Sequence, residues 1–168
     1  MHDALVLSTQ KTPIGDLTLI AQGDTVVVCE FSDHEDRVAR QLRRFYSGAT
    51  IKNDALNKNL SISFEAYFSG DINALNALKT NPAGSDHDLR VWTFLRKIPV
   101  GTTTYYGAIA QNLASSPRAV GGANGRNPVA LIHPCHRVIG ADGSLTGYAG
   151  GLNRKEWLLQ HEGVLLAL

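Results

Sequence analysis

The sequence His133-Pro134-Cys135-His136-Arg137-Val138 places a thiol, an imidazole and a guanidinium next to one another, in a chain with only two cysteines. A thiol is a strong nucleophile only as a thiolate, and a neighbouring His or Arg lowers the thiol pKa. For His136 to act on Cys135, directly or through a water, the backbone must turn between them, because adjacent residues of an extended strand point to opposite faces. Pro134 favours such a break because its φ is fixed. The hexapeptide therefore predicts a reactive cysteine.

Other interpretations of the motif remain open at this point. A cytosolic cysteine is most often a small buried hydrophobic residue. His133, Cys135 and His136 are spaced too tightly for a structural zinc site, and no second Cys pair follows, so we expect no metal. A hydrolase dyad would add an orienting acid, for which Glu162 is the candidate. Glu162 is expected at the C-terminal end of a helix, where the macrodipole disfavours an acid, but from these residues alone a solvated surface Glu is the preferred interpretation.

Composition bounds the class of protein. The 168 residues suffice for one domain or two small ones, and 43% of them are hydrophobic. No apolar run approaches the roughly 20 residues of a membrane span, and Met1-His2-Asp3 does not begin a secretory signal. Two distant cysteines, Cys29 and Cys135, are no disulfide framework, so we expect a cytoplasmic protein.

Charge is distributed unevenly along the chain. The net charge is +1, but residues 1–83 carry 8 Lys and Arg against 10 Asp and Glu, whereas residues 84–168 carry 8 against 5. A basic second half is compatible with a nucleic-acid surface. Taken alone, the charge is explained better by ordinary solvated surface.

Turn and periodicity signals predict the elements of the first half. Residues 17–21 and 26–31, joined by Gln22-Gly23-Asp24, form an expected β-hairpin. Helices are expected from near Glu35 and over residues 53–68. Asn81-Pro82-Ala83-Gly84-Ser85 reads as a linker, which gives two domains, residues 1–83 and residues 84–168.

The second half is expected to be mostly helical. Helices are predicted over residues 89–97, over 105–113 with Thr103 or Thr104 as the cap, and over 118–126 after the start signal Ser115-Ser116-Pro117. The last two, joined by a tight turn, form the pattern of a helix-turn-helix. Residues 129–132 look strand-like, and a final helix over 154–162 is expected to be capped by Asn153 and stopped by Gly163.

Taken together, these motifs resemble one family, the O6-methylguanine-DNA methyltransferases of the bacterial constitutive type. The resemblance is dense from Val91 to Gly163. It rests on residues 98–106, 118–124, Asn127-Pro128, Pro134-Cys135-His136-Arg137-Val138, Gly147-Tyr148-Ala149-Gly150-Gly151, residues 154–159 and His161-Glu162-Gly163. In the first half it is looser, through Thr12-Pro13-Ile14-Gly15 and Tyr67-Phe68-Ser69-Gly70.

The resemblance implies an α+β architecture. Its parts would be an N-terminal ribonuclease-H-like α/β domain that supports the second, and a mostly helical, winged-helix-like C-terminal domain with a helix-turn-helix, which binds DNA and transfers the alkyl group. The activity it implies is direct DNA repair: the alkyl group of O6-alkylguanine in double-stranded DNA moves irreversibly to the protein, once per molecule and without a cofactor. A cytoplasmic monomer is implied, whereas O4-alkylthymine as a second substrate and cooperative binding to DNA are left open.

The resemblance also implies roles for single residues. Cys135 would accept the alkyl group, His136 would act as its base through a water, and Glu162 would orient His136. Asn127 would brace the turn, and Tyr106 would help to expel the base and donate a proton toward guanine N3. Arg118 would enter the duplex. The further DNA-binding residues implied are Ala119, Gly122, Asn124, Arg126, Thr104 and Tyr105, and the base pocket would be lined by Val138, Tyr148, Ala149 and Gly150.

The chain departs from the family pattern in places. The segment Leu113-Ala114-Ser115-Ser116-Pro117 is about two residues shorter than the usual turn, His133 replaces an apolar residue, and His87 stands where many members have Phe. Gln22 falls near the position of a zinc-ligating Cys of some animal members, so no zinc is expected. Two alternatives remain: a non-catalytic damage-binding protein of the alkyltransferase-like type, against which Cys135 argues, and a Cys-His hydrolase, against which the Arg118 helix and the Gly-rich loop argue.

Overall fold

The computed structural model describes residues 4–166 and shows a mixed α+β protein. Its chain divides into two compact units, one of Met1–Ala83 with Pro128–Ile132, and one of Gly84–Asn127 with His133–Leu168. Within the described residues, no helix has the length and apolar character that crossing a membrane requires.

The first unit is built on a five-stranded sheet with the order β4-β1-β2-β3-β5. β1 (Leu5–Gln10), β2 (Leu17–Gln22) and β3 (Thr25–Phe31) are antiparallel neighbours, while the edge strands β4 (Ile51–Asn53) and β5 (Lys79–Thr80) pair in parallel. The hairpin expected over residues 17–31 is confirmed. Every residue of β3 after Thr25 is buried, because both faces of the sheet are covered.

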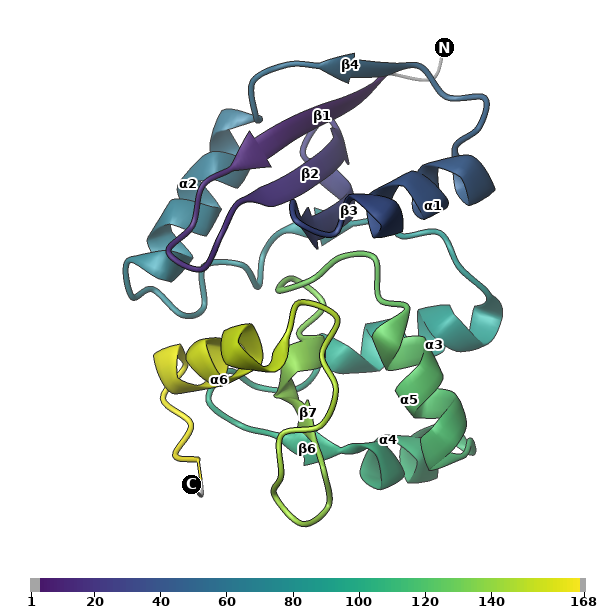
Figure 1. Ribbon diagram of the computed structural model, residues 1–168, viewed down its shortest axis with the longest axis vertical. Coiled ribbons are helices and arrows are strands. Elements are labelled where there is room, and N and C mark those ends of the chain that lie inside the picture. Colours follow the sequence, from purple (N-terminus) through teal and green to yellow (C-terminus); the bar gives the residue numbers. More distant parts are fainter. Residues whose placement is uncertain (1–3, 167–168) are drawn as a thin grey trace. The chain divides into compact units, whose positions relative to one another are not determined.

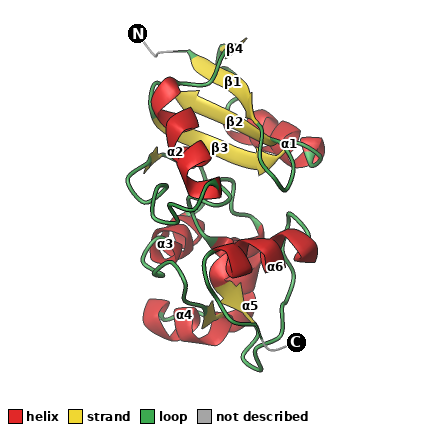
Figure 2. Cartoon of the chain, turned by 90° about the vertical axis from the view of Figure 1, so that its left-hand side faces the viewer, coloured by secondary structure: helices red, strands yellow, loops and turns green. Residues whose placement is uncertain are grey.

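Two helices cover this sheet. α1 (Glu35–Phe45) begins where the sequence predicts and buries Val38 against Leu5, Ile20 and neighbouring strand residues. α2 (Lys58–Phe68) lies in front of the sheet in Figure 2, with α1 behind it. The helix predicted over residues 53–68 begins later, at Lys58. Asn57 caps it by accepting a hydrogen bond from the Asn59 amide, and residues 51–53 form β4 instead.

The described part of the second unit, up to residue 166, holds four α-helices around a small core. They are α3 (Asp86–Leu95), α4 (Tyr106–Leu113), α5 (Pro117–Gly125) and α6 (Leu152–His161). A two-stranded parallel sheet joins β6 (Thr104–Tyr105) to β7 (Val138–Ile139), as Figure 1 shows. Val91, Trp92 and Leu95 of α3 pack with Ile109, Val120 and Cys135 in this core.

Some of the helix boundaries in the second unit agree with the capping signals in the sequence, and others do not. Ser116 caps α5 by accepting from the Ala119 amide, with Pro117 at the first helical position, as the sequence predicts. Ser85 caps α3, which starts at Asp86 and ends at Leu95, earlier at both ends than the range 89–97.

Two predicted caps are wrong. The cap of α4 is Tyr105, without a side-chain hydrogen bond, because Thr104 and Tyr105 are drawn into β6. Asn153 lies inside α6, whose cap is Gly151 at φ 97°. The stop at Gly163, with φ 86°, is confirmed.

The segment 128–132 belongs to the first unit. The Cys29 amide donates to the Pro128 carbonyl (2.9 Å), and the Ala130 amide donates to the Cys29 carbonyl (2.8 Å). The strand expected over 129–132 reduces to a single bridge between Cys29 and Val129, after which the chain turns, with Leu131 at φ 69°. Segment 128–132 is followed directly by the hexapeptide His133–Val138, which contains Cys135.

Candidate active site

Cys135 begins a single 3-10 turn, Cys135–Arg137, which provides the break in the backbone that the sequence predicts. Pro134 precedes it with φ −78°, and the Cys135 amide donates to the His133 carbonyl (2.7 Å). Asn127 Nδ2 donates to the same carbonyl (2.8 Å), so Asn127 braces the turn from the end of α5. Cys135 is 6% exposed and packs in the core of its unit.

His136 is fully buried and faces Glu162, with 2.9 Å between Nε2 and Oε2. A carboxylate only accepts hydrogen bonds, so Nε2 carries the proton of this pair. His136 Nδ1 is buried and has no hydrogen-bond partner within residues 4–166. Burial lowers the pKa of His136, against the opposing effect of Glu162. The imidazole is therefore neutral, with Nδ1 as its acceptor.

Glu162 is a buried carboxylate rather than a solvated surface residue. It caps the C-terminus of α6 and binds Arg137 through two hydrogen bonds, Nε to Oε1 (2.8 Å) and Nη2 to Oε2 (3.0 Å). Burial alone would raise the pKa of Glu162, but His136 and Arg137 bring it well below its usual range. The charge on Arg137 offsets that of the carboxylate, and Arg137 Nη1 donates to the Ile98 carbonyl (2.8 Å).

Lys155 is a buried cation that the sequence interpretation missed. Its Nζ donates to the carbonyls of Val138 (2.6 Å) and Thr146 (2.9 Å). Burial lowers its pKa to about 8, and the charge of Cys135 opposes that shift. The spacing of the buried residues 155, 158 and 159 of α6 and of its C-cap, residue 162, is the helical period that could have placed Lys155 on the inner face.

The residues proposed for the base pocket lie on β7 and the loop that follows it. Val138 is buried and pairs through β7 with Thr104 of β6. Tyr106 Oη and Thr146 Oγ1 are 3.1 Å apart, which ties the start of α4 to this loop. Further along the loop, Tyr148 and Ala149 are half-buried and Gly150 is buried.

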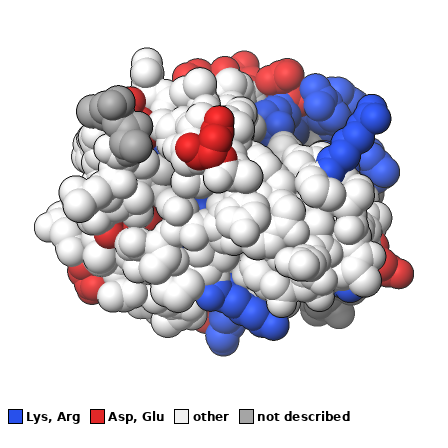
Figure 3. Space-filling model, turned by 90° about the horizontal axis from the view of Figure 1, so that it is seen from below, with Lys and Arg blue, Asp and Glu red and all other residues white. Residues whose placement is uncertain are grey.

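Most residues expected to contact DNA are accessible. Arg118 and Ala119 are exposed in the first turn of α5, Tyr105 is exposed, and Thr104 and Gly122 are half-buried. On the face seen in Figure 3, Lys and Arg form two separate groups with a mainly uncharged surface between them. The surface in this view therefore has no continuous basic track, in keeping with the small net charge.

Two of the residues expected to contact DNA are held by other parts of the protein in this structure. Asn124 is 6% exposed, and its Nδ2 is directed to the Cys135 carbonyl at 3.5 Å, so the side chain is part of the interior. The guanidinium of Arg126 is bound to Asp88 through two hydrogen bonds. The sequence pattern placed both residues on the correct helix but could not give the direction of their side chains.

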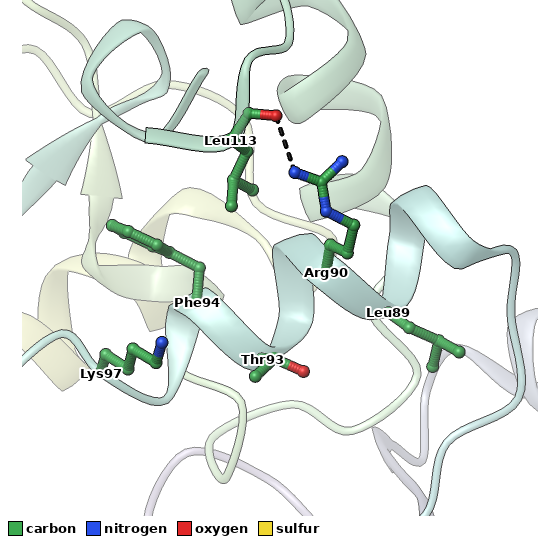
Figure 4. A pocket seen from close by; sticks show the side chains of 6 residues that line it. All are labelled: Leu89, Arg90, Thr93, Phe94, Lys97 and Leu113. Carbon is green, nitrogen blue, oxygen red and sulfur yellow. Dashed lines mark hydrogen bonds between the residues drawn. The ribbon is translucent and has the colours of Figure 1, made fainter. Parts of the chain in front are cut away.

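A cavity of about 310 Å³ opens elsewhere in the second unit, between α3 and the end of α4. In Figure 4, Arg90, which lines the cavity, donates to the Leu113 carbonyl (2.8 Å). The cavity is separate from the site around Cys135, because its lining comes from other residues: Leu89, Arg90, Thr93, Phe94, Lys97 and Leu113. Among the described residues, no group of three or more His, Cys, Asp or Glu could hold a metal ion.

The geometry defines a class of protein that has a buried cysteine, a neutral histidine and a charge-compensated glutamate, together with a helix whose second residue is an exposed arginine. Residues 86–164 match the family model described as 6-O-methylguanine DNA methyltransferase, DNA binding domain. A methylated-DNA–protein-cysteine methyltransferase of Shigella flexneri is 40% identical over 160 residues, 92% of this chain and 94% of that protein. One of Methanosarcina acetivorans is 39% identical over 155 residues, covering 91% and 95%.

Solved structures agree with these relatives. The Mycobacterium tuberculosis OGT in complex with DNA has a TM-score of 0.77 and 39% identity, covering 94% of this chain and 92% of that one. The O6-methylguanine-DNA methyltransferase from Pyrococcus kodakaraensis has a TM-score of 0.70 and 26% identity, covering 95% and 99%. The chain belongs to the methylated-DNA–protein-cysteine methyltransferase family.

Proposed function

We propose that this protein repairs DNA by transferring the alkyl group of O6-alkylguanine to Cys135. The observation that carries the proposal is the buried pair of His136 and Glu162, which keeps a neutral imidazole with a free acceptor nitrogen on the residue that follows Cys135. In the reaction, the thiol proton passes to His136 Nδ1 through a water. The thiolate then attacks the alkyl carbon, so that a carbon–sulfur bond forms and the carbon–oxygen bond to guanine breaks.

The product explains why the protein would act only once. An alkyl thioether is not readily cleaved by water, and nothing in the proposed site would regenerate the thiol. The leaving guanine requires a proton at N3, for which the Tyr106 hydroxyl is the proposed donor. No cofactor takes part, because the damaged base supplies the alkyl group. O4-alkylthymine is a further candidate substrate of the same chemistry.

Access to the base requires that the nucleotide leave the duplex, which costs a few kcal/mol. We assign this step to α5, whose exposed Arg118 would fill the space of the flipped nucleotide, while Ala119 and Gly122 allow close approach to the backbone. Thr104 and Tyr105 would bind nearby. The base would then lie against Val138, Tyr148, Ala149 and Gly150.

The finer architecture belongs to the same proposal. Residues 1–83 would form a ribonuclease-H-like supporting domain, and residues 84–168 a winged-helix-like domain whose α4 and α5 act as a helix-turn-helix. The protein would work in the cytoplasm as a monomer, and binding to DNA could be cooperative.

The deciding experiment is intact-mass analysis after incubation with a duplex that carries one O6-methylguanine. We expect a gain of one methyl group per protein that saturates, is lost in Cys135→Ala and is retained in the matched control Cys29→Ala, since Cys29 is the other, fully buried cysteine. Binding without a mass change would move the protein to the non-catalytic damage-binding class. Neither binding nor mass change would favour a Cys-His hydrolase.

Arg118→Ala tests the DNA step separately. It should slow reaction with the duplex more than reaction with a free alkylated base, which requires no flipping. Equal losses on both substrates would remove Arg118 from the flipping step.

A further inference from the structure

Arg126, at the C-terminal end of α5, is held by Asp88 of α3. Arg126 Nη2 donates to Oδ1 of Asp88 at 2.8 Å, and Nε donates to Oδ2 at 3.3 Å. The Arg126 side chain is 55% exposed, but that of Asp88 is only 10% exposed. The two parallel bonds use the planar guanidinium as a fork, a geometry that fixes orientation as well as distance.

Gly122 provides the space for this ion pair. A Cβ atom at Gly122 would lie 3.0 Å from Arg126 Nη1, so the guanidinium folds back across the surface of α5 where this glycine leaves room. A side chain at Gly122 would make this guanidinium shift by a few tenths of an ångström. Gly122, which the sequence analysis expects to allow close approach to DNA, therefore also leaves space for the Arg126 side chain.

The same two helices are joined by a second polar link. Trp92 Nε1 of α3 donates to the Ala123 carbonyl of α5 at 2.8 Å, and this bond is buried. The Trp92 ring lies tightly against Gly84, where a Cβ atom would come within 2.5 Å of it. One helix thus holds the last turn of the other through a buried bond and a more exposed ion pair.

Asp88 is itself fixed in place. It lies in the first turn of α3, and its amide donates to the capping Ser85 Oγ at 3.1 Å. Burial alone would raise the pKa of Asp88, but the bonds from Arg126 lower it overall. The carboxylate is therefore charged and fixed in position, so it can hold Arg126 at the end of α5 in one orientation.

We propose that Asp88 and Arg126 form a positioning pair that orients α5 for entry into DNA, and that Arg126 is not itself a phosphate contact. This inference rests on the proposed function, because it concerns the helix assigned to carry Arg118 into the duplex. Both residues act through α5 rather than on the substrate. Loss of either partner should therefore have the same effect on DNA binding.

The experiment measures duplex dissociation constants over a range of salt concentrations for Asp88→Asn, Arg126→Gln and the double variant. Arg40→Gln is the matched control, because Arg40 forms a solvated ion pair with Asp36 on α1, in the first unit. We expect each single variant to bind about fivefold more weakly, the double variant to be no weaker than either, and the salt slope to stay that of the wild type. The control should match the wild type throughout.

The opposite assignment gives opposite results. If Arg126 contacted a phosphate, Arg126→Gln would reduce the salt slope by about 0.9, and Asp88→Asn would tighten binding by freeing the guanidinium. Either result would overturn the proposal. Unchanged dissociation constants at a temperature where all variants are folded would also overturn it, because the pair would then serve only stability.

A second readout separates α5 from the nucleophile. Reaction with free O6-benzylguanine uses Cys135 but no duplex, so its rate should be the same in all variants. A loss equal to that on duplex DNA would place the effect of the pair on the nucleophile and refute the proposal. If the wild type bound duplex but gained no methyl group, the proposed function would fail, whereas the binding comparison would still decide the role of Asp88 and Arg126.

Discussion

His133 makes the stability of this protein depend on pH in a window that can be measured. It lies two residues before Cys135 and is 3% exposed. Burial, with the nearby charge of Arg96, lowers its pKa from 6.5 to about 3. A substitution that removes this titration without creating a cavity is His133→Leu, since an apolar residue is usual at this position in the family that the sequence resembles.

The size and sign of the effect follow from proton binding by the two states. Because the pKa of His133 is lower in the folded than in the unfolded protein, the unfolded chain takes up the proton first as the pH falls. The free energy of unfolding therefore decreases as the pH drops below about 6.5, and it continues to decrease toward about pH 3. Between pH 7 and pH 5 the loss from His133 amounts to about 2 kcal/mol.

The assay is urea unfolding of the wild type and His133→Leu at pH 7 and pH 5. The wild type should lose about 2 kcal/mol more than the variant over this interval. His136, whose pKa is also lowered, contributes to both proteins and cancels in the difference. Glu162 has its pKa lowered from 4.5, so its effect lies at lower pH. Equal losses in the two proteins would refute a neutral, buried His133.

Three further changes test other parts of the structure. Glu162→Gln leaves the buried Arg137 guanidinium without its carboxylate, so the free energy of unfolding in urea should fall by about 3 kcal/mol. Single-turnover alkyl transfer should also slow, and an unchanged rate would remove Glu162 from the mechanism. Ala114→Gly should raise the free energy of unfolding by about 1 kcal/mol, because Ala114 has the left-handed φ of 51° and ψ of 48°, and a lower urea midpoint would contradict this. Gly84→Ala should lower the free energy of unfolding by about 2 kcal/mol, because the new Cβ would overlap the Trp92 ring. Gly125→Ala is the control, since nothing lies within 4 Å of its new Cβ, and the same shift in both variants would show that the Trp92 contact is unimportant.

Local signals account for the parts of the fold that the sequence predicts. Two apolar runs around a Gly-containing turn predict the hairpin of β2 and β3. The pair Ser116-Pro117 predicts the start of α5. Cys135 and His136 are adjacent, so a reactive cysteine could be predicted there without a fold. Pairing with Glu162, by contrast, was suggested only by the resemblance and an unfavourable helix position, and the structure gives it a distance.

Long-range contacts account for the parts that remained hidden. Strands of two residues, such as β6 and β7, have no periodicity to detect, and their pairing overrides the cap predicted at Thr104. The bonds from Lys155 to two carbonyls and from Arg126 to Asp88 join residues whose side-chain directions depend on packing. A motif indicates which residues are present on a helix, whereas only the assembled core determines which way they point.

The segment 128–132 makes the two units topologically inseparable, because the chain passes between them three times rather than once. A protein shortened to residues 84–168 would keep Val129, Leu131 and Ile132 but lose the strand that contains Cys29, whose backbone bonds hold this segment. The freed segment would expose apolar side chains that end three residues before the turn at Cys135. Exchange of the first unit for that of a relative would therefore have to preserve the strand partner of residues 128–130.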